Sequence, residues 1–257
     1  MCGRFAVTTD PVRLAGLIHA VDETGAALGA PNYLAAPNYN VAPTTAIAAV
    51  VDSGDDGQST RRIWAMRWGL VPHWVKADAR GRPRTAPLLI NARAETLTTS
   101  PAFRSAARHR RCLVPMDGYY EWMRNADLPG ASKTPFYMSA VDGGPLLVAG
   151  LWSVWTPGES AESAESAGPM RTAAIVTTDA VGALARVHDR MPLVIAERDW
   201  DRWLDPDSAA PADLLSAAPE VSGIDIREVS TLVNAVANNG PELIAPADRG
   251  NQPVGLF

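Results

Sequence analysis

The second residue of the chain, Cys2, has the most distinctive chemical potential in the sequence. We expect the initiator Met1 to be removed, because the side chain that follows it is small. The mature chain would then begin with a cysteine that bears a free α-amine and a thiol on adjacent carbons. Their reference pKa values are about 8 and 8.5, so both groups are partly in their reactive forms near neutral pH. Such an amine can capture an aldehyde as a Schiff base, which the thiol closes to a thiazolidine ring.

Other short segments hold side chains that could move the protons of such a reaction. Glu121 stands among aromatic residues, and apolar neighbours raise a carboxyl pKa toward neutrality. His188 can exchange protons near pH 7, and Asp189 follows it directly. Asn91 and Arg93 point to one face if the chain is extended there, and an amide beside a guanidinium suits a sugar–phosphate. Each residue alone is also common in a purely structural role, so only the set carries weight.

The basic residues of the chain are concentrated in its middle. Thirteen Arg or Lys and four Asp or Glu lie between Arg61 and Arg124, although the net charge of the whole chain is −5. A localised basic block is typical of a site for a polyanion, and a solvated basic face is the structural alternative. Tryptophan side chains can stack on unpaired bases. Those that flank the block are Trp64, Trp68, Trp74 and Trp122.

The apolar pattern favours strands over helices. A helical pattern begins at Pro11, after the capping residue Asp10, and two more cover 100–109 and 197–204. The runs typical of strands are 46–51, 61–68, 111–114, 119–123, 135–140, 146–155, 172–177 and 192–196. Because strands and helices do not alternate, we expect an α+β fold. Its core would be a β-rich, mixed or antiparallel, barrel-like sheet with peripheral helices.

The length and composition fit one globular domain over residues 1–257. We expect flexible insertions at 76–87, which is rich in basic residues, Gly and Pro, and at 156–169, with its repeated Glu-Ser-Ala. No apolar run is long enough for a bilayer, and no signal peptide is apparent. The two cysteines, Cys2 and Cys112, indicate a reducing cytoplasm. With four histidines and neither CxxC nor HExxH, we expect no metal and no other cofactor.

Seven segments, read in order, resemble the SOS-response-associated peptidase (SRAP) family, whose members crosslink abasic sites in single-stranded DNA. They are MCGRF (1–5), YNVAP (39–43), WGLVPHW (68–74), NARAET (91–96), RCLVP (111–115), DGYYEW (117–122) and HDRMP (188–192), with a similar closing segment at 233–244. One such motif would be weak, but this many in register over nearly the whole chain is highly specific. The resemblance implies a single SRAP-like domain with a β-rich α+β core, in agreement with the strand pattern.

The resemblance also implies roles for residues of this chain. Cys2 would be the nucleophile, Glu121 the proton shuttle and His188 a second acid–base group. Asn91 would orient the N-terminal residue and the sugar. The residues implied at the DNA, with the two arginines at phosphates flanking the lesion, are Arg4, Arg93, Asn40, Pro43, Trp74 and Thr177.

The predicted function is therefore covalent capture of abasic sites in single-stranded DNA by Cys2 after Met1 removal, shielding the lesion during replication-coupled repair. We expect a monomer that acts at the nucleoid in the cytoplasm, with no membrane partner. The resemblance leaves open AP lyase activity, self-processing of Met1 and peptidase activity. Two other interpretations also stay open. Glutamine amidohydrolases with an N-terminal nucleophile begin Met-Cys-Gly as well, and a non-covalent single-strand-binding module would need no nucleophile.

Overall fold

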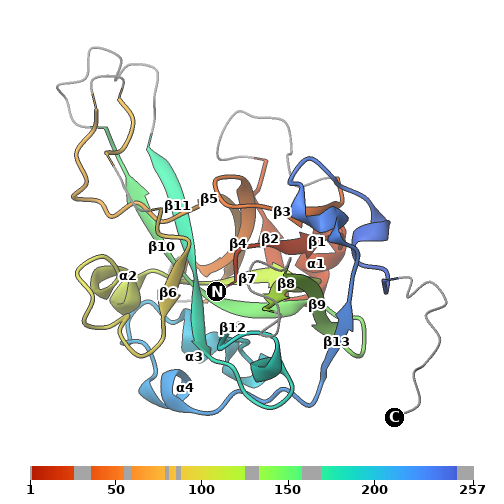
Figure 1. The fold of residues 1–257 in the computed structure, drawn as a ribbon. Helices are drawn as coiled ribbons and strands as arrows, with labels where there is room; N and C mark the ends of the chain where they lie inside the picture. Colours follow the sequence, from red (N-terminus) through yellow and green to blue (C-terminus); the bar gives the residue numbers. More distant parts are fainter. Residues whose placement is uncertain are drawn as a thin grey trace, which may run out of the picture.

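The computed structural model describes residues 2–25, 36–54, 59–78, 81–84, 88–124, 133–157 and 169–247. Two β-sheets share the centre of the molecule, and short helices lie around them (Figure 1). Of the predicted insertions, 79–80, 85–87 and 158–168 lie outside the described residues. The flexibility of these insertions therefore stays a prediction.

Five strands close into a ring, which gives the molecule its barrel-like core. In order around the ring they are β5 (Arg61–Trp68), β4 (Ala46–Asp52), β7 (Arg111–Met116), β10 (Leu146–Trp155) and β11 (Met170–Asp179). Four neighbouring pairs are antiparallel, and a parallel pairing of β11 with β5 closes the ring. The predicted β-rich, barrel-like α+β fold is thereby confirmed. The neighbours β10 and β11 extend together beyond the rest of the ring (Figure 1).

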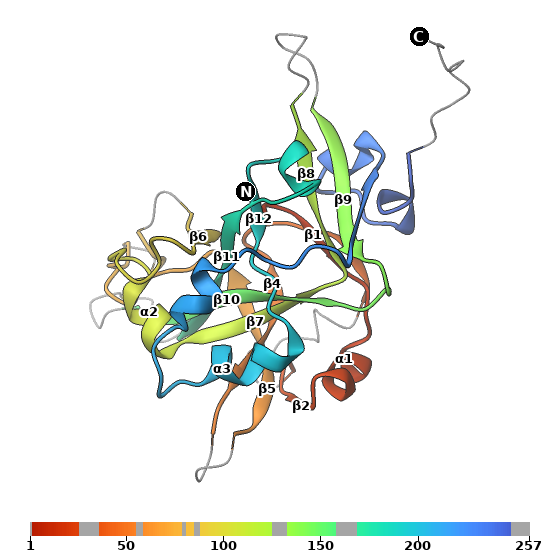
Figure 2. The ribbon, with the colours of Figure 1, turned by 90° about the horizontal axis from the view of Figure 1, so that it is seen from below.

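Three short strands extend the ring, and a second sheet packs beside it. The extensions are β2 (Ala20–Asp22) on β5, and β6 (Asn91–Arg93) and β12 (Arg190–Pro192) on β11. The second sheet is antiparallel, in the order β13 (Ile224–Glu228), β9 (Thr134–Ala140), β8 (Gly118–Met123), β1 (Phe5–Val7) and β3 (Asn38–Val41). The chain leaves the ring from β7 into β8 and returns from β9 into β10 (Figure 2).

Alternation along the strands divides the core into two faces, because successive strand residues point to opposite sides. In β10, Val148 belongs to a cluster with Cys2 and the second sheet. Its neighbour Ala149 belongs to a cluster with the helices, which contribute Leu14 and Trp203. One face of the ring is therefore sealed by helices, and the other receives the start of the chain.

The helices form largely where the sequence predicts them. In α1 (Pro11–Leu17), Pro11 opens the helix and the Asp10 carboxylate accepts from the backbone N–H groups of the first turn. In the second pattern, α2 covers Arg104–His109 and a turn at 101–103 precedes it. The third predicted helix, over 197–204, forms as two elements: the 3₁₀ turn η2 (Glu197–Asp199) and the α-helix α3 (Trp200–Leu204). The remaining helical elements are α4 (Ala212–Ser216), η1 (Leu184–Arg186), η3 (Thr231–Asn234) and η4 (Pro241–Leu243). Within the described ranges, no helix combines the length and apolarity needed to cross a bilayer.

The predicted strand 192–196 is shorter than expected and begins earlier, as β12. Beyond Pro192, Val194 forms only an isolated bridge. The backbone here bonds alternately to two strands: Leu193 donates to Val176 of β11, and Ile195 donates to Leu147 of β10. Because the segment crosses between two partners, it does not continue as one regular strand.

Candidate active site

Cys2 lies at the start of the chain, directly before β1, and its position is set by that strand. Phe5 of β1 pairs with Tyr119 of β8 and Val41 of β3, and its ring packs 5.0 Å from that of Trp68. The side chain of Cys2 is fully buried in the same cluster. The nucleophile proposed from the sequence is therefore held in the core, where the two sheets meet.

Burial changes the chemistry of the Cys2 thiol. Desolvation raises its pKa, and the charge of Glu121 raises the pKa further. A partly deprotonated thiol, as expected from reference values, describes an exposed cysteine; the thiol here stays protonated at neutral pH. Before it can act as a nucleophile, this thiol must transfer its proton to another group.

Asn91 reaches the backbone of Cys2 from β6. Its side-chain Nδ2 donates a hydrogen bond of 2.9 Å to the Cys2 carbonyl oxygen. The chain is extended at 91–93, as a shared face for Asn91 and Arg93 requires, and it forms β6, which pairs in parallel with β11. Ala92, between Asn91 and Arg93, belongs to the cluster under the helices, so its two neighbours point to the opposite face.

Glu121 is a buried carboxyl on β8, with 3% of its surface exposed. Tyr119 lies two residues earlier on the same face of the strand. Burial raises the pKa of Glu121, and the nearby imidazole of His188 partly offsets this effect. As predicted from its aromatic neighbours, Glu121 keeps a proton to higher pH than an ordinary glutamate. A carboxyl whose pKa is raised in this way is better suited to donate a proton than an ordinary glutamate.

His188 stands in the loop between η1 and β12, and it contacts two neighbours through the same nitrogen. The backbone N–H of Arg190 donates to Nδ1 at 3.0 Å, and a carboxylate oxygen of Asp189 lies 2.7 Å from Nδ1. The loop is anchored by Ala180, whose N–H donates to the Asp189 carbonyl. The electrostatic interaction of His188 with Glu121 places both in one site.

Three buried polar atoms beside Cys2 have no hydrogen-bond partner among the described residues: Asn91 Oδ1, Tyr119 OH and Thr177 Oγ1. Burial raises the pKa of Tyr119, and the charges of Cys2 and Glu121 raise it further. Thr177 lies two residues after Ile175, which packs in the Cys2 cluster, so the two side chains share one face of β11. A buried polar group without a partner costs about 1–3 kcal/mol. Their gathering at one nucleophile indicates a site that receives a polar ligand.

Arg4 and Asn40, both predicted at the DNA, contact each other at the edge of the site. Arg4 Nη1 donates to Asn40 Oδ1 at 2.6 Å and to the Val233 carbonyl at 2.9 Å, and its guanidinium lies over the Trp122 ring. Asn40 is buried, and its Nδ2 donates to carbonyls within 233–238. Asn40 thus fastens the closing segment to the site, and its contact with DNA stays a prediction.

The tryptophans of the basic block differ in exposure, and Trp64 and Trp122 are half-buried. Trp74 has 59% of its surface exposed, whereas Trp68 is fully buried and donates from Nε1 to the Ile90 carbonyl at 2.9 Å. Pro43, also predicted at the DNA, is half-buried in the turn after β3. Trp74 is therefore free to stack on a base, and Trp68 is part of the core.

A groove of about 540 Å³ lies beside His188 and is lined by arginines. Arg93 was predicted from the sequence as a DNA contact, whereas Arg124 and Arg186 were not predicted as site residues. Both adjoin motifs already noted: Arg124 follows DGYYEW by two positions, and Arg186 precedes His188 by two. A search for cations close to those motifs would have found them. Tyr119 was also missed, and its signal was the two-residue spacing from Glu121 on a strand.

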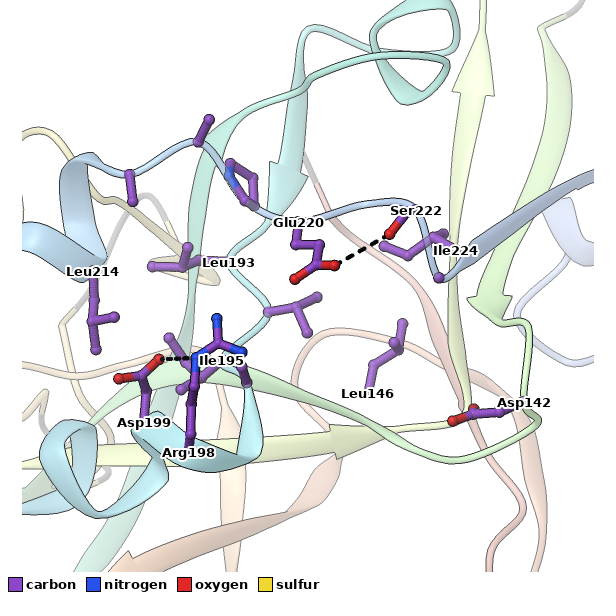
Figure 3. Close-up of a pocket in the computed structure, with 16 residues that line it drawn as sticks. Asp142, Leu146, Leu193, Ile195, Arg198, Asp199, Leu214, Glu220, Ser222 and Ile224 are labelled. Carbon is purple, nitrogen blue, oxygen red and sulfur yellow. Dashed lines mark hydrogen bonds and ion pairs between the residues drawn. The ribbon is translucent and has the colours of Figure 1, made fainter.

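Another cavity, of about 490 Å³, lies between β10, the chain after β12 and the loop before β13. Leu146, Leu193 and Ile195 form its apolar part, and Arg198 and Glu220 extend into it from opposite sides (Figure 3). None of the predicted site residues lines it, so it is separate from the Cys2 site. In the part of the chain that the structure describes, no three His, Cys, Asp or Glu side chains gather as a metal site.

Comparison with known proteins agrees with this arrangement. The sequence model of the family "SOS response associated peptidase (SRAP)" matches residues 1–236. "Abasic site processing protein YoqW" of Bacillus subtilis is 35% identical over 192 residues, which are 74% of this chain and 79% of that protein. "Abasic site processing protein HMCES" of Gallus gallus is 27% identical over 76% of this chain and 61% of its own length.

The fold has a similar counterpart among solved structures. A crystal structure of a Bacteroides thetaiotaomicron protein superposes with a TM-score of 0.75 at 23% identity, covering 96% of this chain and all of the other. At that identity the likeness concerns the fold. The match of the family model over residues 1–236, together with a relative at 35% identity, shows that the chain belongs to the SRAP family.

Proposed function

We propose that this protein processes abasic sites in DNA by capturing the aldehyde of the ring-opened sugar at Cys2, after Met1 has been removed. The observation that carries the proposal is the convergence of Asn91, Tyr119 and Thr177 on Cys2, each with a buried polar atom that has no described partner. These groups are suited to a polar, oxygen-rich ligand such as an open-chain deoxyribose. The SRAP relatives named as abasic site processing proteins support this choice of substrate.

The reaction needs proton transfer but no redox step. The α-amine of Cys2 adds to the C1′ aldehyde to form a carbinolamine, which loses water to form a Schiff base. The Cys2 thiol then gives up its proton as its sulfur adds to the carbon of the protonated imine, closing a thiazolidine. One C–N and one C–S bond form, and one water leaves.

Glu121 and His188 are placed to carry these protons. A protonated Glu121 supplies the proton that converts the carbinolamine hydroxyl into water, and the resulting carboxylate accepts the thiol proton. Burial raises the pKa of the Cys2 thiol and of the Glu121 carboxyl and so favours their neutral forms before reaction, because a low-dielectric environment penalises a charge. His188 is the second acid–base group, acting on the sugar.

Single-stranded DNA is the proposed partner. Trp74 offers an exposed stacking surface, and the arginine-lined groove next to His188 offers cations for the phosphates beside the lesion. Bound in this way, one copy of the chain would cover the lesion without a second subunit. We place this activity in the cytoplasm, at the nucleoid.

The test is a single-stranded oligonucleotide with one abasic site, incubated with mature protein and run on a denaturing gel. We expect a heat-resistant shifted band that disappears with Cys2→Ala and with an uncleaved extension before Cys2, which places the α-amine in a peptide bond. Cys112→Ala is the matched control and should still crosslink, because Cys112 is equally buried but lies within β7 and cannot carry a free α-amine. No band from wild type, with Met1 removal and the aldehyde verified, would contradict the proposal.

The same preparations separate the two alternatives left open by the sequence. A glutamine amidohydrolase would release ammonia from glutamine in a reaction that Cys2→Ala abolishes. A non-covalent binding module would retain the oligonucleotide on native gels only, with Cys2→Ala bound as tightly as wild type and with strong salt dependence.

A further inference from the structure

Arg190, the first residue of β12, is a buried cation that contacts two neighbouring strands. Its side chain is 8% exposed. Nη1 and Nη2 donate to the two carboxylate oxygens of Glu95 at 2.9 and 2.8 Å, and Nη2 also donates to the Thr177 carbonyl at 2.8 Å. Nη1 forms a further ion pair with Asp179 of β11. A bidentate pair of this kind fixes orientation as well as distance.

The strands joined by Arg190 are those that carry the reacting groups. Glu95 lies in the turn two residues after β6, the strand of Asn91 and Arg93, and Thr177 lies in β11. His188 precedes Arg190 by two residues. The guanidinium therefore ties the amide that holds Cys2 to the loop that holds the imidazole.

The backbone of Arg190 also affects which ring nitrogen of His188 carries the proton. Its N–H donates to Nδ1, and an accepting Nδ1 in a neutral imidazole leaves the ring proton on Nε2. When the ring is protonated, Nδ1 becomes a donor, and the Asp189 carboxylate at 2.7 Å can accept from it. A shift of the Arg190 backbone would remove the N–H that favours an accepting Nδ1, and the Asp189 carboxylate would then favour a proton on Nδ1.

The charges around Arg190 make it a poor ligand for a phosphate. Burial raises the pKa of Glu95, but the hydrogen bonds and the charge of Arg190 outweigh this and leave that pKa below its usual value. Glu95 is therefore ionised at neutral pH. With Asp179 as a second carboxylate partner, the guanidinium has no uncompensated positive charge for DNA.

We propose that Arg190 is a positioning residue for the crosslinking reaction: its fork with Glu95 clamps β6 to β12, and so holds Asn91 and His188 in their reacting geometry without touching DNA. This inference rests on the proposed function of the Cys2 site. It assigns Glu95 a supporting role in the same clamp.

The test compares Arg190→Met, Glu95→Gln and their double variant with wild type. Three quantities are measured: the saturating crosslinking rate, the Kd for an intact single strand at several salt concentrations, and the ¹⁵N resonances of the His188 ring, assigned with His188→Gln. For Arg190→Met we expect a rate loss of about tenfold or more and a Kd within about twofold of wild type, with an unchanged salt slope. The His188 ring signals should shift toward those of a ring protonated at Nδ1. The double variant should be no slower than Arg190→Met, and Arg198→Met, an exposed arginine at the cavity of Figure 3, should match wild type.

Other outcomes would overturn the clamp. A raised Kd with a salt slope reduced by one phosphate contact and an unchanged saturating rate would make Arg190 a DNA ligand. A slower rate with unmoved His188 signals would show that the pair does not act through the imidazole. If Arg190→Met fails to fold, Glu95→Gln is compared with wild type in its place. A smaller loss of crosslinking rate is expected for it, because the amide of the new side chain keeps one oxygen that can accept from Arg190. If wild type forms no crosslink, the proposed function fails. The His188 signals alone then show whether the Arg190–Glu95 pair positions the imidazole.

Discussion

The side-chain amide of Asn91 donates a 2.9 Å hydrogen bond to the backbone carbonyl oxygen of Cys2. Because the donor is a side chain of β6 and the acceptor is the main chain of the nucleophilic residue, the bond orients the α-amine and the thiol together. The carboxamide oxygen of Asn91 is buried without a described partner, so the same side chain has an acceptor to offer a substrate.

Replacing Asn91 with Ala should therefore slow crosslinking by about 10- to 100-fold, the loss expected when a reacting group is displaced by about an ångström. Binding of an intact single strand should change little, because the amide is not at the exposed surface. Rates and native-gel affinities on the same preparations check this. An equal loss of affinity and rate would instead make Asn91 a general DNA contact.

Glu121→Gln removes the proposed proton shuttle while keeping the shape of the side chain. General acid–base catalysis typically contributes 10²- to 10⁴-fold, so the crosslinking rate should fall by about 100-fold or more. Affinity for an intact strand should stay near that of wild type. If crosslinking continued at the wild-type rate, another group would have to supply the proton, and His188 would be tested next.

The same substitution should stabilise the fold in a pH-dependent way. Because the folded-state pKa of Glu121 is raised, the folded protein binds this proton more tightly than the unfolded chain. The resulting stability is present below the unfolded carboxyl pKa and is lost as pH rises through the folded pKa. Glu121→Gln, neutral throughout, should raise Tm at pH 8 and have a smaller effect at pH 4; each kcal/mol would appear as about 2–4 °C. A larger gain at pH 4 would reverse the assigned direction.

Trp74→Ala should weaken binding of single-stranded DNA without affecting stability. Stacking of a base on an aromatic side chain is worth about 1–3 kcal/mol, so we expect a Kd about 5- to 150-fold higher. Trp68→Phe is the matched control: it should lower Tm, because a fully buried side chain loses its hydrogen bond to the Ile90 carbonyl. Fluorescence anisotropy and thermal unfolding on both variants separate the two effects.

The groove arginines should appear in the salt dependence of binding. Single substitutions of Arg93, Arg124 and Arg186 to Gln should each reduce the slope of log K against log salt by about 0.7, the value for one phosphate contact on a single strand. Arg198→Gln serves as an exposed control away from the groove. A slope that stays at the wild-type value in all three variants would exclude this groove as the phosphate path.

The parts of the fold that the sequence predicts well are its long strands. In β5, alternation of Trp64, Met66 and Trp68 is visible locally, and all three pack against the same cluster. Three of the strands that hold the site, β1, β3 and β6, have three or four residues, too few to show a period. Closure of the ring depends on parallel pairing of β5 with β11, about a hundred residues apart, which no local pattern encodes.

The sequence by itself determined the chemical groups of the site and, through several motifs in register, the family. A cysteine at position two, a carboxyl among aromatic residues and a histidine beside an aspartate can be read along the chain. Only the tertiary structure decided that the Cys2 thiol is protonated, that Tyr119 joins the site and that Arg190 braces it. The physical reason is that burial, unpaired polar atoms and ion pairs arise between segments far apart in the chain, and the folded arrangement alone brings them into contact.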